Sequence, residues 1–256
     1  MVIEFNGVRG KSYKSALMEY PDVWDEDLKV MYEYLRPQNG ESIVEIGAGS
    51  GFYSERISDA IGNSGVLYVV EPSIEQLLPI IRNESLDNIA YHCVLAEDFE
   101  LPEGCFVDKI WTRGAFHHVK NKQKVLSNLA KSATQSTKLY IFDIFSNSKV
   151  ADFFDTYVAL ACTTGHEVHF LSKLYASSMC QVTGWKKPKF VDIPLRWKFE
   201  TENDIGRFLT MMLSLKPEFT NNDTLQIAKE VLGYEKVDNL YYLNWPMTLM
   251  ITERDL

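Results

Sequence analysis

The chain has 256 residues, of which 46% are hydrophobic and 12% aromatic. That length suits one domain and supplies enough apolar material for a sizeable core, so disorder of the whole chain is excluded. With 26 Lys and Arg against 35 Asp and Glu the net charge is −9, and no long basic block is present. Nucleic acid and anionic membranes are therefore unfavourable partners.

No apolar run approaches the roughly 18 residues that a membrane-spanning helix needs. The first residues, MVIEFNGVRGKS, place Glu4 and Asn6 where an export signal has an unbroken apolar region, so a cytoplasmic location is expected. The cysteines at positions 93, 105, 162 and 180 form no C-x-x-C pair. We expect them to be reduced and mostly buried thiols.

The first half of the chain alternates between predicted strands and predicted helices. Apolar residues at intervals of three and four, broken at Pro21, predict two helices between Ser12 and about Tyr34. Short apolar runs predict strands at 42–46, 66–70, 90–95, 109–112 and 138–145, with helices at 52–61, 73–82 and 122–133. Continuous apolar strands between helices are typical of a parallel sheet covered on both faces, so we expect a doubly wound α/β fold.

The second half is less regular. Helices are predicted at 149–161, 172–182, 201–215 and 223–232, and strands at 189–195 and 247–253. Thr201 and Asp204 have the spacing of a capping box at the start of the third of these helices. No internal repeat, low-complexity tract or linker divides the chain, so one domain over residues 1–256 is expected.

The segment VEIGAGSGFYS, residues 44–54, lies between the first predicted strand and its helix. In open α/β sheets ligands bind at the carboxyl ends of strands, where glycines let a ligand approach the backbone. Gly47, Gly49 and Gly51 are spaced G-x-G-x-G, and Phe52 occupies the position of the last glycine of a dinucleotide fingerprint. This spacing disfavours a nicotinamide dinucleotide and its pyrophosphate.

Glu71 closes the second predicted strand, 20 residues after Gly51. A carboxylate at that place can accept hydrogen bonds from the hydroxyls of a ribose. The glycine turn and Glu71 together indicate a cofactor that contains a nucleoside but no diphosphate.

With these motifs in this order the chain resembles the class I S-adenosylmethionine-dependent methyltransferases. Residues 45–51 (EIGAGSG) are similar to the family's glycine-rich first motif, and Glu71 to its ribose-binding acid. Residues 96–104 (AEDFELPEG) resemble the loop after the third strand. Residues 111–119 (WTRGAFHHV) resemble the segment after the fourth strand, which in the family runs beside the sulfonium and the substrate.

The resemblance implies a Rossmann-like three-layer sandwich with a seven-stranded, mostly parallel sheet. Residues 189–195 and 247–253 would be its final strands, the last inserted antiparallel. Residues 1–40 would form a helical cap, 41–146 the cofactor-binding core, and 147–256 the substrate-side helices and final strands. The cap, residues 146–171 and the long connection between the final strands are expected to build a lid over the substrate.

S-adenosylmethionine is the cofactor that the resemblance implies. Its predicted binding residues, taken from the matching motifs, are Glu45, Gly47, Ala48, Gly49, Gly51, Glu71, Pro72, Ala96, Glu97, Asp98 and Arg113. Leu95 stands where family members often carry an Asp that meets the adenine amino group. Adenine recognition is therefore left to Glu97, Asp98 or backbone groups.

His117 and His118 are the candidates for a catalytic base, because imidazole can take a proton from a hydroxyl or a protonated amine near neutral pH. The alternative is that the two rings only pack or cap the following helix. Arg113, the third catalytic candidate, could pair with a carboxylate of the substrate or form a surface ion pair. His166 and His169 are spaced one residue short of the zinc motif H-E-x-x-H, so no metal is expected.

The predicted function is transfer of a methyl group from S-adenosylmethionine to an O, N or C atom of a small-molecule substrate. We expect a monomer or homodimer with no nucleic acid or membrane partner. Two alternatives remain open from the sequence. One is a protein or peptide methyltransferase, and the other is a non-catalytic module that binds the cofactor and acts through a protein partner.

Overall fold

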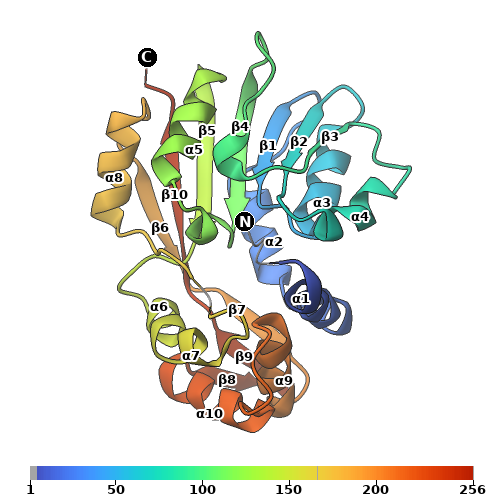
Figure 1. Cartoon of the computed structure of the whole chain (residues 1–256), viewed down its shortest axis with the longest axis vertical. Helices are drawn as coiled ribbons and strands as arrows, with labels where there is room; N and C mark the ends of the chain where they lie inside the picture. The colour runs from blue at the N-terminus through green and yellow to red at the C-terminus, as the bar shows by residue number, and fades with distance from the viewer. Residues whose placement is uncertain (1–4, 166, 256) are drawn as a thin grey trace.

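The computed structural model of the chain describes residues 5–165 and 167–255. Within them a seven-stranded sheet has the order β3-β2-β1-β4-β5-β10-β6 (Figure 1). Its strands are β1 (Ser42–Ile46), β2 (Val66–Val70), β3 (Ile89–His92), β4 (Val107–Arg113), β5 (Ala133–Asp143), β6 (Lys189–Ile193) and β10 (Met247–Glu253). β10 runs antiparallel to both β5 and β6, whereas β1 to β5 pair in parallel. The predicted fold class and the antiparallel last strand are confirmed.

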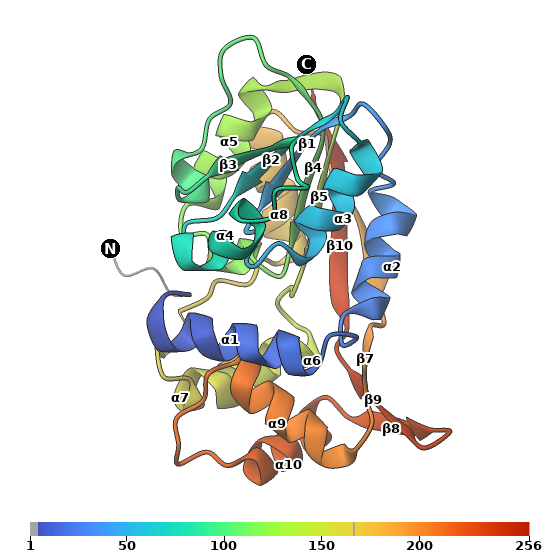
Figure 2. The same cartoon turned by 90° about the vertical axis from the view of Figure 1, so that its right-hand side faces the viewer.

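Helices cover both faces of this sheet (Figure 2). They are α2 (Asp25–Tyr34), α3 (Phe52–Ile61), α4 (Ile74–Ile81), α5 (Lys122–Lys131) and α8 (Lys173–Val182). Successive side chains of a strand point to opposite faces of the sheet. Ile43 therefore packs in the core beneath α2, α3 and α4, while Val44 packs in the core beneath α5 and α8. Both residues are fully buried, which explains why β1 is apolar without interruption.

A lobe lies beyond the carboxyl ends of the parallel strands (Figure 1). It contains α6 (Lys149–Phe153), a π-helical turn (Phe154–Val158), α7 (Ala159–Ala161), α9 (Glu202–Met212) and α10 (Asn221–Val231). A small antiparallel sheet has the order β7 (Arg196–Phe199), β9 (Leu240–Asn244), β8 (Tyr234–Val237). The predicted capping box of α9 is present, with Thr201 and Asp204 bonding reciprocally.

The sequence analysis did not predict the small sheet. Its strands are four or five residues long and mostly half-buried or exposed, so the hydrophobic pattern marks them only weakly. The turn between β8 and β9 is formed by Asp238 and Asn239, with φ of 48° and 68°. A two-residue hairpin turn of this kind needs positive φ at both positions, which Asp and Asn adopt more readily than most residues. The Asp238-Asn239 pair is therefore the sequence signal that could have revealed these strands.

Helix α1 (Gly7–Glu19) lies between α4 and the lobe (Figure 2). At one end the Gln76 amide on α4 donates to the carbonyls of Phe5 and Gly10, each at 3.2 Å. Further along, the Ser12 hydroxyl donates to the Met211 carbonyl of α9 at 2.8 Å. These contacts hold α1 across the carboxyl edge of the sheet.

Two further expectations concern the thiols and membrane insertion. Cys162 and Cys180 are buried, but Cys93 is exposed and Cys105 half-buried, so the expectation of mostly buried thiols is correct for only part of the set. Among the described residues, every helix is too short or too polar to cross a membrane.

Candidate active site

A cavity lies at the carboxyl ends of β1, β2 and β4, and residues of the lobe also line it. The turns after β1, β2 and β4 contribute to its wall, as do α1 and the lobe. The predicted cofactor residues found in the wall are Gly47, Ala48, Gly49, Glu71, Pro72, Ala96, Glu97 and Arg113. Glu45, Gly51 and Asp98 are not among the residues that line it.

The glycine turn has a positive φ at all three glycines, 72° at Gly47, 56° at Gly49 and 87° at Gly51. A Cβ at Gly47 would lie 2.3 Å from the Cβ of Ala115, and one at Gly51 would lie 2.0 Å from Cγ2 of Ile80. At Gly49 a Cβ would meet nothing within 4 Å. Gly47 and Gly51 therefore permit close packing, whereas Gly49 leaves open space beside the cavity.

Glu71 supports this turn from the end of β2. Its Oε2 accepts a hydrogen bond from the Gly49 amide at 3.0 Å, and its Oε1 accepts one from the Ser73 amide at 2.9 Å. Burial raises the pKa of Glu71, and the two backbone amides partly offset that effect. A carboxylate has about four acceptor positions, so two amides leave capacity for hydroxyl groups of a ligand.

Glu45 lies behind the glycine turn. Its side chain is buried and accepts a hydrogen bond from the Ser54 hydroxyl on α3. Burial raises the pKa of Glu45 to about 8, against the lowering effect of Ser54. In this structure Glu45 therefore connects β1 to α3.

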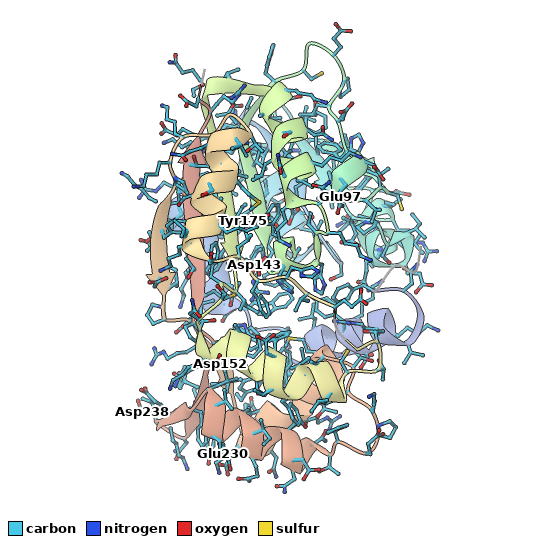
Figure 3. The ribbon with its side chains drawn as sticks, turned by 60° about the vertical axis from the view of Figure 1, so that its left-hand side comes forward. Glu97, Asp143, Asp152, Tyr175, Glu230 and Asp238 are labelled. Atoms are coloured by element: carbon cyan, nitrogen blue, oxygen red, sulfur yellow. The ribbon has the colours of Figure 1, made fainter. Side chains whose placement is uncertain are left out.

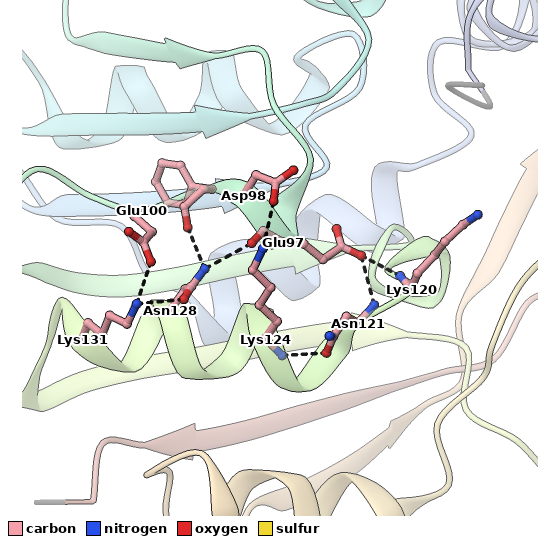
Figure 4. Close-up of polar contacts among 9 residues, drawn as sticks. Glu97, Asp98, Glu100, Lys120, Asn121, Lys124, Asn128 and Lys131 are labelled. Carbon is pink, nitrogen blue, oxygen red and sulfur yellow. Dashed lines mark hydrogen bonds and ion pairs between the residues drawn. The ribbon is translucent and has the colours of Figure 1, made fainter. Parts of the chain in front are cut away.

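In the segment after β3, the two acids considered for adenine recognition have different surroundings (Figure 4). Glu97 lines the cavity, and its carboxylate accepts hydrogen bonds from the amides of Lys120 and Asn121 at 2.8 and 3.0 Å. Asp98 instead pairs with Lys124 of α5 at 2.9 Å. Leu95 also lines the cavity, so an apolar side chain and Glu97 occupy the wall there.

The loop after β4 brings His117 and His118 to the cavity wall. The His117 Nδ1 lies 2.6 Å from Oδ1 of Asp143, and the His117 amide donates to Oδ2 at 3.0 Å. Both side chains are buried, and Figure 3 shows Asp143 inside the molecule, above α6. The His118 ring lies beside that of His117, with centroids 4.2 Å apart and planes tilted by 42°, and it makes a T-shaped contact with Phe5.

Asp143 is ionised in this arrangement. Burial raises its pKa, but the adjacent His117 and the hydrogen bonds of two backbone amides outweigh burial and lower the pKa overall. A carboxylate facing Nδ1 favours the tautomer with the proton on Nδ1. The sequence analysis did not identify Asp143, although a lone Asp inside the apolar run KLYIFDIF was a usable signal.

Arg113 is paired within the fold. Its Nε donates to Oδ1 of Asp27 at 2.8 Å, and its guanidinium lies 4.6 Å from the ring centre of Trp24. Burial lowers the pKa of Arg113, but the attraction of Asp27 outweighs it, so the pKa is raised. The Arg113 side chain is only 9% exposed and that of Asp27 is fully buried, so the surface-ion-pair interpretation is wrong.

The remaining predicted site concerns a metal. His166 lies outside the described residues, so the H-E-V-H segment is not described as a unit. In the rest of the described chain, no group of three or more His, Cys, Asp and Glu side chains is arranged to hold a metal ion.

Residues 44–141 match the family model of the methyltransferase domain. A curated relative, phosphoethanolamine N-methyltransferase 2 of Caenorhabditis elegans, is 22% identical in an alignment of 238 residues that covers 86% of this chain and 50% of the relative. The chain thus spans about half the length of that relative.

Two solved structures have the same fold. The YcgJ protein of Bacillus has a TM-score of 0.65 and 16% identity over 91% of this chain and 99% of that one. Haemonchus contortus phosphoethanolamine N-methyltransferase 2, in complex with phosphomonomethylethanolamine and S-adenosylhomocysteine, has a TM-score of 0.61 and 12% identity over 91% of this chain and 53% of that one.

The sheet order and the glycine turn agree with the match to the family model and define a Rossmann-like fold around a methyltransferase domain. Residues 44–141 therefore carry a methyltransferase domain with the fold of the class I S-adenosylmethionine-dependent methyltransferases, and S-adenosylmethionine is its cofactor. The cavity fits a nucleoside of this kind. It has open space beside Gly49 that a Cβ would fill, and the carboxylate of Glu71 stands on its wall.

Proposed function

We propose that the chain transfers the methyl group of S-adenosylmethionine to a small molecule held in this cavity. The observation that carries the proposal is that one cavity combines the glycine turn, Glu71 and the buried His117–Asp143 pair. Helix α1 and the lobe then close the cavity over the cofactor-binding core, since Tyr13 of α1 and Phe154 of the lobe line it.

Glu71 would hold the ribose hydroxyls, and the turn at Gly49 would approach the remainder of the cofactor through its backbone. Leu95 and Ala96 would contact the adenine ring, with Glu97 as the polar group near it. When bound, S-adenosylmethionine supplies an electrophilic methyl carbon on a sulfonium. The chain's contribution is to align the acceptor with that carbon and to exclude water.

His117 would be the general base. With Nδ1–H donated to Asp143, the lone pair of the neutral imidazole is on Nε2, which would take the proton of the acceptor. Asp143 would compensate the positive charge that His117 then carries. Arg113 would shape the wall, because its charge is already balanced by Asp27.

A small-molecule acceptor is favoured over a protein because buried aromatic side chains of the lobe, Phe154, Trp197 and Trp245, line the cavity. The named substrate of the curated relative is also a small molecule. A purely non-catalytic binding module is disfavoured, because it has no need for a buried His–Asp pair at the cavity wall.

Calorimetric titration with S-adenosylhomocysteine tests the cofactor part of the proposal. We expect Glu71→Ala to weaken binding by about 1–3 kcal/mol, because ribose hydroxyls would lose their acceptor. Asp98→Ala is the matched control, because Asp98 pairs with Lys124 and does not line the cavity. The affinity of this variant for S-adenosylhomocysteine should equal that of the wild type. Equal affinity of the Glu71 variant would contradict the ribose assignment.

A further inference from the structure

The part of the cavity wall that the lobe contributes is apolar. The lobe contributes aromatic and aliphatic side chains to it, namely Phe154, Trp197, Met212, Leu213 and Trp245, and Met247 follows at the start of β10. Among the described residues that line the cavity, the lobe supplies no charged or hydroxyl side chain. A ligand portion next to this wall would find packing partners but no hydrogen-bond partner from these side chains.

The aromatic part of this wall is tightly ordered. Trp197 and Trp245 stack with centroids 4.1 Å apart and planes 18° apart, and Phe154 contacts Trp245 edge-on at 6.0 Å. The indole N–H of Trp197 is used inside the fold, where it donates to Oδ2 of Asp27 at 3.1 Å. Phe154 opens the π-helical turn, and such turns are frequent at functional sites.

The charged groups of the wall do not suit an anionic acceptor. Arg113 is neutralised by Asp27, and Arg9 is buried within the fold, where it donates to Thr164 and lies over the ring of Phe5. Glu71 and Glu97 add negative charge to the same cavity. Moving a phosphate from water into this site would lose hydration without gaining a matching set of cations.

We propose that the acceptor is an uncharged, largely apolar small molecule that presents one hydroxyl or amine to His117, and not a phosphorylated amine. This inference rests on the proposed function of the same cavity. For a hydroxyl acceptor, the oxygen forms its bond to the methyl carbon as the carbon–sulfur bond breaks, and the proton passes to Nε2 of His117. The products are a methyl ether and S-adenosylhomocysteine.

The test uses full-length protein saturated with S-adenosylhomocysteine and 2-naphthol as a neutral, fluorescent probe. We expect saturable binding of 2-naphthol that phosphoethanolamine does not displace, and no methylated product when phosphoethanolamine is incubated with S-adenosylmethionine. Trp245→Ala should weaken 2-naphthol binding at least about tenfold, because a large buried contact area is lost. Met212→Ala removes a smaller side chain of the same wall and should weaken 2-naphthol binding about threefold or more.

Leu174→Ala is the matched control, because Leu174 is 79% exposed on α8 and does not line the cavity. Its affinity for 2-naphthol should be that of the wild type. Methylation of phosphoethanolamine, its displacement of the probe, absence of saturable probe binding, or wild-type affinity in both cavity variants would each overturn the acceptor inference. Failure of S-adenosylhomocysteine itself to bind would instead refute the proposed function.

Discussion

Arg113→Met is the most informative single change for the architecture of the cavity wall. It keeps the aliphatic stem of the side chain but leaves the carboxylate of Asp27, which is fully buried, with the indole of Trp197 as its remaining side-chain partner in the described structure. Breaking a buried ion pair by removing one partner costs about 3–5 kcal/mol, since the other charge stays desolvated. Loss of the cation–π contact with Trp24 adds to this cost.

Urea denaturation followed by circular dichroism measures the change in the free energy of unfolding. The double variant Asp27→Asn with Arg113→Met should be more stable than Arg113→Met alone, because no charge then remains buried. Lys124→Met is the matched control, since its pair with Asp98 is about half exposed and should contribute at most about 1 kcal/mol. A loss of unfolding free energy below about 1 kcal/mol for Arg113→Met would refute the reasoning. It would mean that Asp27 does not hold the wild-type guanidinium strongly, so that Arg113 could pair with an anionic acceptor.

Three further outcomes are expected. Gly51→Ala should destabilise the fold by about 1–3 kcal/mol more than Gly104→Ala in thermal denaturation, because both have a positive φ but only Gly51 would clash with Ile80. Burial raises the pKa of Glu45 from 4.5 to about 8, so its contribution to stability is full below pH 4.5 and is lost as the pH rises towards 8. Glu45→Gln should therefore flatten the dependence of the unfolding free energy on pH between these two values. Asp143 has a lowered pKa, because His117 and backbone amides outweigh the raising effect of burial. Its stabilising contribution is therefore present above its ordinary pKa and is lost on acidification. If Asp143→Asn lost stability in acid as the wild type does, the pairing with His117 would be contradicted.

The elements around the proposed cofactor site were predictable because their signals are local. β1, β2 and α3 have the predicted bounds, since a buried parallel strand is a continuous apolar run and the glycines mark where it ends. The glycine spacing with Glu71 pointed to the same edge of the sheet, where the cavity lies.

The acceptor side was not predictable in the same way. The Asp27–Arg113 and His117–Asp143 pairs join residues far apart in the sequence, and neither has a spacing motif. The lobe's short strands place Trp197 beside Trp245, a contact that depends on a hairpin which the hydrophobic pattern does not reveal. Asp98 follows Glu97 directly but its carboxylate pairs with Lys124, so sequence adjacency alone does not select the side chain that lines the cavity.

A crystal structure of the complex with S-adenosylhomocysteine tests the central claim most directly. The account predicts that both ribose hydroxyls lie within hydrogen-bond distance of the Glu71 carboxylate, with the sulfur facing the loop that contains His117. A nucleoside bound elsewhere, or a ribose that makes no contact with Glu71, would contradict it.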